Sequence, residues 1–493
     1  MKKKLLTMAG ILSAILLISG ISFAAYHHMN EKDSPQFISV YGSKKNTKLD
    51  SCALCHSGGE IVKNSGKVVK MGSCQWCHHS YGYDASGNIV DTLNPYGKDY
   101  YMNGRNADAI RAIANLDSDK DGFSNIQEIE AIRYPGDAND DPEKMIAPYR
   151  VYTKDELKGF SQHTQFMLMN THRSGDFYAE YTGVPLEDLL EDAEILDTAT
   201  GITVYAPDGW STNHPLDAVD DPNLYHIKGI YPPATFYHMA EAEEDWCDYS
   251  SPPCNSYSHS NPIHVSGGLK ALLALQRDGV DLETGILDDN NYLNGDGPYR
   301  IVVPQKVPCP PDQSAKSANQ NVEWAFNEDW DHNAGFCTRS VTIIKVEPLP
   351  EGTTDIDVME AGWDFVDEEK IIIYGAIKGQ TGQVSGEVFT LENEPFENIT
   401  ATIVETGHKA TTNNNGTFII ENVPVGTYQL SIKNENNVLL VMDHIVVSEN
   451  QDTQLSAISL PSKQSTCDID GDNRIGLTDL IHWFRVLAGL KVN

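Results

Sequence analysis

The spacing of apolar and polar residues changes along this 493-residue chain and predicts several domains. A predominantly apolar run covers residues 5–21. Residues 26–147 are rich in lysine and glycine, so they offer little conventional core. From about residue 148, strand-like runs alternate with short helical ones, which indicates an α+β domain. Residues 380–460 show short alternating strands split by turn residues, which predicts a small β-sandwich.

The N-terminal apolar run is predicted to be a Sec-type signal peptide, residues 1–25. Lys2, Lys3 and Lys4 precede it, and a small-x-small site allows cleavage after Ala24 or Ala25. No basic stop-transfer flank follows, and no other apolar run is long enough to span a bilayer. We therefore expect a periplasmic, extracellular or cell-surface protein without a transmembrane anchor after cleavage.

Two C-x-x-C-H pentapeptides, separated by seventeen residues, dominate the chemistry of the next segment. This is the attachment motif of c-type haem, because two thiols about one helical turn apart can each add to a vinyl group of one porphyrin. The histidine that follows then ligates the iron. The predicted haem residues are Cys52, Cys55 and His56 for the first group, and Cys74, Cys77 and His78 for the second. The alternatives are a zinc site, which would leave both histidines unexplained, or two disulfides.

Each haem iron also needs a sixth ligand or an open site. The candidates near the motifs are His27, His28, Met71, His79 and Met102. His79 could equally be a surface histidine, and the first two histidines lie close to the new N-terminus.

A calcium loop is predicted after the haem motifs. The segment 117–128 matches the pattern D-x-D-x-D-G-x5-E in full, so that carboxylates at alternating positions converge on one cation. Its predicted ligands are Asp117, Asp119, Asp121, the Phe123 carbonyl, Asn125 and Glu128. An ordinary acidic loop is the alternative.

Alternating oxygen ligands recur at Asp137, Asn139 and Asp141, either as a second site, as in thrombospondin type-3-like repeats, or as an acidic linker. The block as a whole resembles small secreted bacterial cytochromes, in which an N-P-Y-G stretch, here 94–97, and a D-S-D-x-D-G loop follow the C-x-x-C-H motifs.

Residues 150–350 resemble the molybdopterin-binding domain of the sulfite oxidase family. The resemblance rests on ordered segments at 181–190, 204–209, 272–279, 297–304 and 340–346. It implies the fold of that family and, in the family, a pterin-bound molybdenum held by a cysteine thiolate. Here no cysteine lies between Cys77 and Cys247, and the equivalent strand is 165–170, so we expect no working molybdenum centre.

The remaining cysteines and histidines of this region leave alternatives open. For the cysteines we favour local disulfides, Cys247–Cys254 and Cys309–Cys337, which leave Cys467 without a partner. The histidines are interpreted as polar-loop residues or, alternatively, as a distal haem ligand or a metal site. They are His214, His226, His238, His259, His264 and His332.

The C-terminal part resembles two known modules. Segments 386–388, 415–418 and 423–428 resemble the carboxypeptidase-regulatory-like domain, which implies a transthyretin-like sandwich used as a spacer or adhesion module. The tail, 467–490, resembles half of a dockerin, with one EF-type loop and an amphipathic helix. Its predicted calcium ligands are Asp468, Asp470, Asp472, Arg474 and Asp479. A cohesin-like partner is one implication, although a full dockerin has two loops.

The net charge of −34 argues against nucleic acid or an anionic membrane surface as a partner. The predicted architecture is multidomain. It comprises the signal peptide (1–25), a small α/loop dihaem module (26–147), an α+β domain (148–376), an all-β sandwich (377–461) and a short α EF-type tail (462–493).

The predicted function is electron transfer to partner cytochromes or extracellular acceptors. The alternatives are a molybdopterin-dependent oxidoreductase that passes electrons to the haems, and an adhesion or assembly protein with accessory haems.

Overall fold

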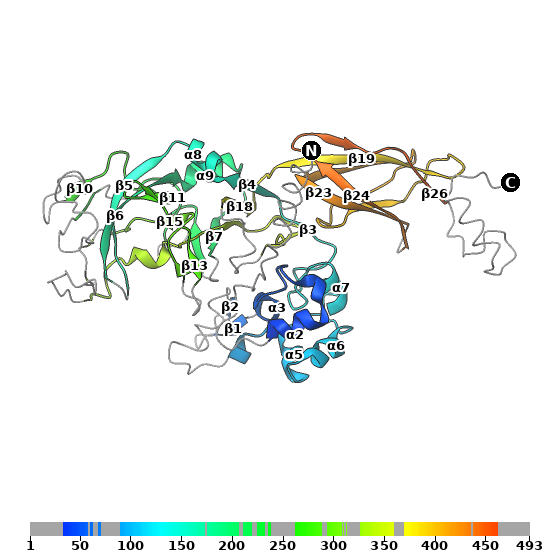
Figure 1. Cartoon of the computed structure of the whole chain (residues 1–493), viewed down its shortest axis with the longest axis horizontal. Coiled ribbons are helices and arrows are strands. Elements are labelled where there is room, and N and C mark those ends of the chain that lie inside the picture. The colour runs from blue at the N-terminus through cyan, green and yellow to red at the C-terminus, as the bar shows by residue number, and fades with distance from the viewer. Residues whose placement is uncertain are drawn as a thin grey trace, which may run out of the picture. The chain divides into compact units, whose positions relative to one another are not determined.

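The structure is a computed structural model, and Figure 1 shows the whole chain. It describes residues 33–57, 60–62, 68–70, 89–172, 175–206, 211–218, 224–231, 235–237, 262–287, 293–307, 309, 312, 326–358, 369–434 and 437–461. The signal peptide, the second C-x-x-C-H motif, the Cys247–Cys254 loop and the tail lie outside these residues. The chain divides into two compact units between Gly379 and Gln380.

Short helices make up most of the described N-terminal segment. Asn94 caps one of them through the Gly97 amide, with proline at its first position, and Asn106 caps the next. The helices are α2 (Asp33–Val40), η1 (Gly42–Lys44), α3 (Ala53–His56), η2 (Ile89–Thr92), α5 (Pro95–Met102), α6 (Ala107–Ile113) and α7 (Asn125–Glu130). A hairpin joins β1 (Glu60–Val62) to β2 (Val68–Lys70).

These helices enclose a core, which the sequence analysis did not expect. Apolar and aromatic side chains from all the larger helices are buried together, and both cysteines of the first motif pack against them. Tyrosines missed as core residues explain the difference, since Tyr96 and Tyr100 are at most 4% exposed. The cluster comprises Phe37, Tyr41, Leu49, Ala53, Leu54, Tyr96, Tyr100, Ala109, Ile110, Ile113, Ile129 and Tyr134.

Two five-stranded sheets build the next part of the first unit. One has the order β12-β11-β6-β5 with β15 beside β11, and the other has the order β4-β18-β16-β7-β8. The strands of the first sheet are β5 (His163–Met169), β6 (Phe177–Pro185), β11 (Leu272–Arg277), β12 (Val280–Asp281) and β15 (Arg300–Val302). Those of the second are β4 (Tyr149–Thr153), β7 (Gly201–Tyr205), β8 (Ser211–Pro215), β16 (Ile343–Glu347) and β18 (Lys370–Gly375).

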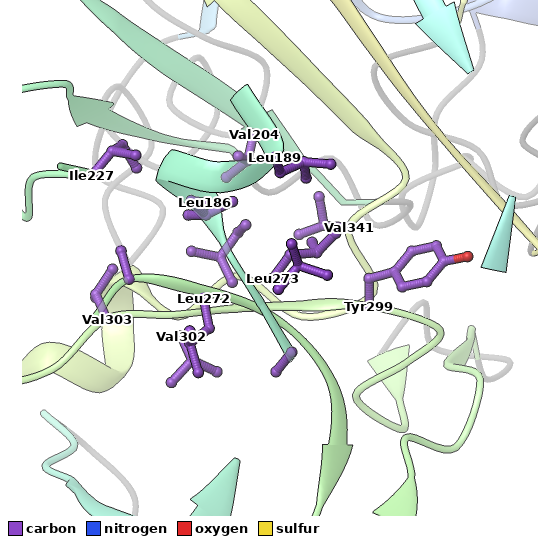
Figure 2. Close-up of a cluster of buried hydrophobic side chains, with 14 of the residues drawn as sticks. Leu186, Leu189, Val204, Ile227, Leu272, Leu273, Tyr299, Val302, Val303 and Val341 are labelled. Carbon is purple, nitrogen blue, oxygen red and sulfur yellow. The ribbon is translucent and has the colours of Figure 1, made fainter. Parts of the chain in front are cut away.

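Smaller elements complete this part, and its two sheets share one core. The helices are α8 (Lys154–Gly159), α9 (Leu186–Asp192) and η4 (Asn333–Phe336). The smaller strand pairs are β9 (Thr235–Tyr237) with β10 (Pro262–His264), β13 (Ile286–Leu287) with β14 (Leu293–Asn294), and β3 (Met145–Ile146) with β17 (Thr353–Thr354). Figure 2 shows Leu186 and Leu189 of α9 gathered with Val204 of one sheet and Leu272 of the other. Helices α8 and α9 lie between strands at the start of this part, but from β8 to β18 the described residues include only the short 3-10 helix η4, so the part is mostly β rather than evenly alternating.

The second unit is a sandwich of two four-stranded sheets around a separate apolar core. One sheet contains β19 (Thr381–Thr390), β22 (Thr417–Pro424), β25 (Asp452–Gln454) and β26 (Ile458–Leu460). The other has the order β21 (Lys409–Thr411), β20 (Thr400–Ile403), β23 (Gly426–Asn434) and β24 (Asn437–Val447). The all-β prediction for this segment is confirmed, and the described chain as a whole is rich in strands with few and short helices.

Among the helices that the structure describes, none has the length and hydropathy that crossing a bilayer requires.

Candidate functional site

The first C-x-x-C-H motif folds as a single helical turn. The Ser51 hydroxyl accepts a bond from the Ala53 amide at 3.3 Å, and the Ser57 amide closes the turn onto the Ala53 carbonyl at 2.7 Å. The turn places His56 inside, 8% exposed, and leaves Cys52 and Cys55 half-buried. The motif therefore presents two accessible thiols and one buried imidazole.

The His56 imidazole is held by Thr92. Its Nδ1 lies 3.2 Å from the Thr92 carbonyl oxygen and 3.0 Å from the Thr92 hydroxyl. Because a carbonyl oxygen can only accept, the contact favours the tautomer with the proton on Nδ1 and the lone pair on Nε2. Burial lowers the pKa of His56 to about 4, although the Thr92 bond opposes this shift. His56 is thus neutral at pH 7, as an imidazole that ligates iron must be.

Helix α5 holds the motif from its other side. The Asn94 amide donates to the Cys55 carbonyl at 2.8 Å, and the Asn94 side chain donates to the carbonyls of Leu54 and Ser57 at 3.1 and 3.0 Å. Gly97 lies so close that an added Cβ would sit 2.5 Å from the Cys55 carbonyl oxygen. Through these contacts the N-P-Y-G stretch, residues 94–97, holds α3 in position.

The three motif side chains do not converge as zinc ligands do. Within the described residues, the acidic loop is the one place where three carboxylate, imidazole or thiol ligand atoms lie within 4.8 Å of one another. Of the sixth-ligand candidates, Met102 projects from the end of α5 with 76% exposure, which disfavours it. His27, His28, Met71 and His79 lie outside the described residues, as do Cys74, Cys77 and His78.

The acidic loop has the geometry of a cation site. The carboxylates of Asp117, Asp119 and Asp121 lie within 4.8 Å of one another. Asp117 accepts bonds from the amides of Lys120 at 2.7 Å and Gly122 at 3.1 Å, which curl the backbone around the carboxylates. Gly122 has φ +105°, a conformation that side chains rarely adopt.

Glu128 supplies independent evidence for a cation. It is fully buried, and neither of its carboxylate oxygens has a hydrogen-bond partner within the described residues. Burial, then the charges of Asp119 and Asp121, raise the pKa of Glu128 to about 9. Burial and the Asp121 charge likewise raise the pKa of Asp119 to about 6. Such a group is costly unless a cation compensates it, and calcium prefers this set of oxygens.

One further predicted ligand, Asn125, has another task. Asn125 is buried, and its side-chain amide donates to the Ile113 carbonyl at 2.8 Å and to the Ser118 hydroxyl at 2.9 Å, so it stabilises the loop.

In the second alternating run, Asp137, Asn139 and Asp141, the Lys144 ammonium contacts the Asn139 carbonyl and lies 3.5 Å from the Asp141 carboxylate. A lysine side chain therefore supplies the positive charge there. In the acidic loop, the Phe123 amide donates to the Asp121 carboxylate at 2.8 Å. The ligands predicted in the tail lie outside the described residues; they are Asp468, Asp470, Asp472, Arg474 and Asp479.

The Cys309–Cys337 disulfide predicted from the sequence is absent, because the two buried thiols have different partners. Cys309 Sγ lies 3.0 Å from the Gln305 side-chain amide, whereas Cys337 Sγ lies 3.4 Å from the Val303 amide. Both thiols are close to the end of β5, and Cys337 Sγ lies 4.0 Å from Met169 Sδ. Burial raises the pKa of each thiol to about 11.

Three histidines of the two-sheet part have ordinary structural environments. His214 is buried, with Nδ1 3.0 Å from the Tyr225 carbonyl, and burial lowers its pKa to about 4. His226 stacks on Tyr231 at 4.2 Å, and His332 Nε2 lies 3.1 Å from Asp312. The polar-loop interpretation is wrong for His214, which is buried within strand β8 because its ring nitrogen has a backbone partner, whereas His226 and His332 lie outside the named strands. Only the backbone of His264 is described, and His238 and His259 lie outside the described residues.

Sequence reasoning missed a buried ionic cluster next to the motif. Lys48, 1% exposed, donates to Asp140 at 2.9 Å and to the Asp355 carbonyl at 3.3 Å. Asp140 also accepts a bond from the Tyr134 amide at 2.9 Å and lies 3.5 Å from Arg133 Nε. A lone lysine and a lone aspartate 92 residues apart carry no sequence signal.

Comparison with known proteins identifies one segment. Residues 383–461 match the family model of the carboxypeptidase regulatory-like domain, so the predicted resemblance of the sandwich is confirmed. No curated protein matches the chain.

Solved structures resemble the chain only remotely. A type II cohesin–X-dockerin complex from Acetivibrio cellulolyticus is 25% identical over 21% of this chain and 72% of that one, with a TM-score of 0.16. The sulfane dehydrogenase SoxCD from Paracoccus pantotrophus is 11% identical over 60% and 67%, at 0.21. The major pilin subunit BcpA of Bacillus cereus is 10% identical over 62% and 71%, at 0.17. Scores this low support no inference about the present chain.

Proposed function

We propose that this chain is an exported c-type cytochrome that transfers electrons through covalently attached haem. The observation that carries the proposal is the buried His56 imidazole, whose Nδ1 is bonded to Thr92 while two half-buried thiols lie on the same helical turn. A haem iron would supply the one-electron chemistry, cycling between two oxidation states.

The residues present fit this cofactor. Cys52 and Cys55 would anchor the porphyrin through thioethers, and His56 Nε2 would bind the iron. Thr92 fixes the ring orientation of His56, which tunes the basicity of the ligand. The aromatic and aliphatic side chains around α3 exclude water, and burial of this kind sets the reduction potential. Cys74, Cys77 and His78 would hold a second haem in the same way.

Calcium is proposed as the structural cation of the haem module. Asp117, Asp119, Asp121 and Glu128 would supply its oxygens, and Asn125 would brace them. The EF-type tail at 468–479 would bind a second calcium ion. The proposed partners are cytochromes or extracellular electron acceptors in the periplasm or at the cell surface.

The proposal is tested by measuring whether the chain carries covalently attached haem. The full chain is produced in a bacterial host with a c-type cytochrome maturation system, and intact mass and a pyridine haemochrome assay are measured. We expect two haem groups that remain attached after denaturation. Cys55→Ala should leave one haem weakly attached, whereas Cys309→Ala, outside the motifs, should keep both. A chain that carries the mass of the polypeptide alone would refute the proposal.

A second candidate function is supported by the carboxypeptidase regulatory-like domain, which is suited to a spacer or adhesion role. In that case the haems would be accessory, and the tail would bind a cohesin-like or other cell-surface protein. Loss of partner binding on calcium chelation, with redox activity intact, would favour this function. A molybdopterin-dependent oxidoreductase is the third candidate, which metal analysis separates from the other two.

A further inference from the structure

The acidic loop is connected to helix α5 through Ser118, the residue between the first two aspartates. The Ser118 hydroxyl donates to the Asp99 carboxylate on α5 at 2.7 Å. The same hydroxyl accepts the Asn125 side-chain amide at 2.9 Å, at the start of α7, the helix that carries Glu128. One hydroxyl thus joins both halves of the loop to α5.

Helix α5 is in turn the support of the haem motif. Its cap, Asn94, bonds the carbonyls of Leu54, Cys55 and Ser57, and its Gly97 touches the Cys55 backbone. Because the packing around Gly97 leaves no space for a methyl group, a displacement of α5 cannot be absorbed there and must move the end of α3 that carries His56.

The segment before α3 is fixed by different contacts. The Lys48 ammonium is buried against Asp140, and its backbone amide donates to Asp357 at 2.8 Å. The Ser51 hydroxyl, one residue before Cys52, donates to the Lys48 carbonyl at 2.9 Å. Helix α3 therefore has a fixed support at its start and a support connected to the acidic loop at its end.

We propose that cation occupancy of the acidic loop controls the haem bound at His56, through Ser118, Asp99 and α5. With calcium bound, the Glu128 carboxylate is compensated and α7, Ser118 and α5 are held as described above. Without it, the Asp117, Asp119 and Asp121 carboxylates lie within 4.8 Å of one another and the buried Glu128 side chain lacks a partner among the described residues; the loop opens, which releases Ser118 and lets α5 and His56 shift. This inference rests on the proposed function, since it concerns the same haem.

Linkage makes the coupling measurable in both directions. If calcium changes the reduction potential of this haem, then oxidation or reduction must change calcium affinity by the corresponding factor. A tenfold difference in Kd for calcium between the two redox states corresponds to about 59 mV for a one-electron couple.

The experiment is a spectroelectrochemical titration of the full-length haem protein with calcium and with chelator. The wave of the first haem is assigned by its loss in the double variant Cys52→Ala with Cys55→Ala. We expect its potential to depend on calcium in the natural sequence and to lose that dependence in Glu128→Gln, although the tail loop is intact. Ser118→Ala removes no carboxylate ligand, so it should still bind calcium at the loop while most of the potential shift disappears. Ser39→Ala, at an exposed serine of α2, is the matched control and should behave like the natural sequence.

The possible failures are distinguishable. A protein that carries both haems and binds calcium at the loop, but whose first potential is the same with calcium and with chelator, overturns the inference and leaves the proposed function standing. A full shift in Ser118→Ala overturns the route through α5. A chain without covalent haem overturns the proposed function and the inference with it.

Discussion

At the scale of single residues, the first C-x-x-C-H motif is positioned by neighbours whose size and hydrogen bonds both matter. Gly97 has backbone angles that any residue could adopt, so glycine is needed there because helix α5 packs very close to the Cys55 backbone. An added Cβ would also lie 3.0 Å from the Leu93 side chain and 3.0 Å from the Cys55 side chain. Thr92 provides the acceptor that orients His56. Neither residue is a proposed haem ligand, yet Thr92 contacts the His56 ring and Gly97 packs against the backbone of its helical turn.

Gly97→Ala should damage the proposed haem site. The methyl group would lie 2.5 Å from the Cys55 carbonyl oxygen, and overpacking of this kind costs about 1–3 kcal/mol. We expect a lower melting temperature and less haem per chain, measured by calorimetry and by the pyridine haemochrome assay. Gly42→Ala is the control, because nothing lies within 4 Å of its added Cβ. Equal haem content and melting temperature in the two variants would contradict the close-packing argument.

His408 should make the sandwich sensitive to acid. Burial lowers the pKa of His408 to about 4, although a backbone bond at Thr406 opposes this shift. Between about pH 6.5 and 4 the unfolded chain binds a proton at this histidine and the folded chain does not, so stability is lost as pH falls through this range. The loss is of the order of 3 kcal/mol.

Calorimetry of the full chain between pH 7 and pH 4 tests this expectation, with the sandwich transition assigned by Ile432→Ala in its core. His408→Asn should flatten the acid dependence of that transition. His444→Asn, at an exposed histidine of the same unit, should retain it. A transition that is equally acid-sensitive in both variants would show that other groups are responsible.

At the scale of elements, α7 shows how a short helix can be specified by its ends and by a ligand. Ser124 and Gln127 form a capping box at its start, and Ile129 anchors it in the core. Glu128, one position earlier, is fully buried, and its carboxylate has no hydrogen-bond partner among the residues that the structure describes. The helix therefore presents a buried carboxylate to the loop that precedes it.

Calcium should stabilise the first unit. A cation that binds the folded state alone raises the free energy of unfolding by about 2.7 kcal/mol at a hundredfold excess over Kd. We expect the melting temperature of that unit in the full chain to fall when calcium is chelated, and Asp117→Ala combined with Glu128→Ala to reproduce the fall and abolish the calcium sensitivity. Glu143→Ala, at an exposed glutamate beyond the loop, is the control. Identical melting in calcium and in chelator would mean that the loop is an acidic turn.

At the scale of the whole molecule, the predicted haem module and the two-sheet part are joined by buried polar contacts as well as by sequence. Asp140 bonds the Thr354 hydroxyl, Lys48 reaches Asp355 and Asp357, and β3 pairs in parallel with β17. Leaving a buried donor or acceptor without its partner costs about 1–3 kcal/mol. The module is therefore best studied within the full chain, since a fragment ending near residue 147 would lack these partners.

Natively purified protein should contain no stoichiometric molybdenum. Within this domain, no cysteine lies in or before residues 165–170, the strand that corresponds to the family's molybdenum ligand. The fold does bring Cys309 and Cys337 to the end of that strand, β5. Burial raises the pKa of both thiols, so both are protonated at neutral pH. Elemental analysis measures the metal directly. Both thiols should also resist alkylation until the protein is denatured. One molybdenum per chain would instead make the oxidoreductase the leading function.

Local sequence was sufficient for features whose interactions are local. The acidic loop is specified within 117–128 because its carboxylates, its turn glycine and its buried glutamate are near neighbours in the chain. The sandwich at 380–460 could be predicted because strand periodicity of two assigns each side chain to the core or to solvent. The C-x-x-C-H spacing predicts a helical turn by itself, and α3 is that turn.

Tertiary structure decided everything that depends on partners distant in sequence. Thr92 meets His56 across 36 residues, Asp140 meets Lys48 across 92, and Cys337 reaches Met169 across 168. The sequence predicts a disulfide between Cys309 and Cys337, but in the fold the Val303 amide contacts the Cys337 thiol and the Gln305 side-chain amide contacts the Cys309 thiol. Pairings of this kind are set by the packing of whole sheets and helices, which minimises buried polar groups without partners, and no short window of residues contains that information.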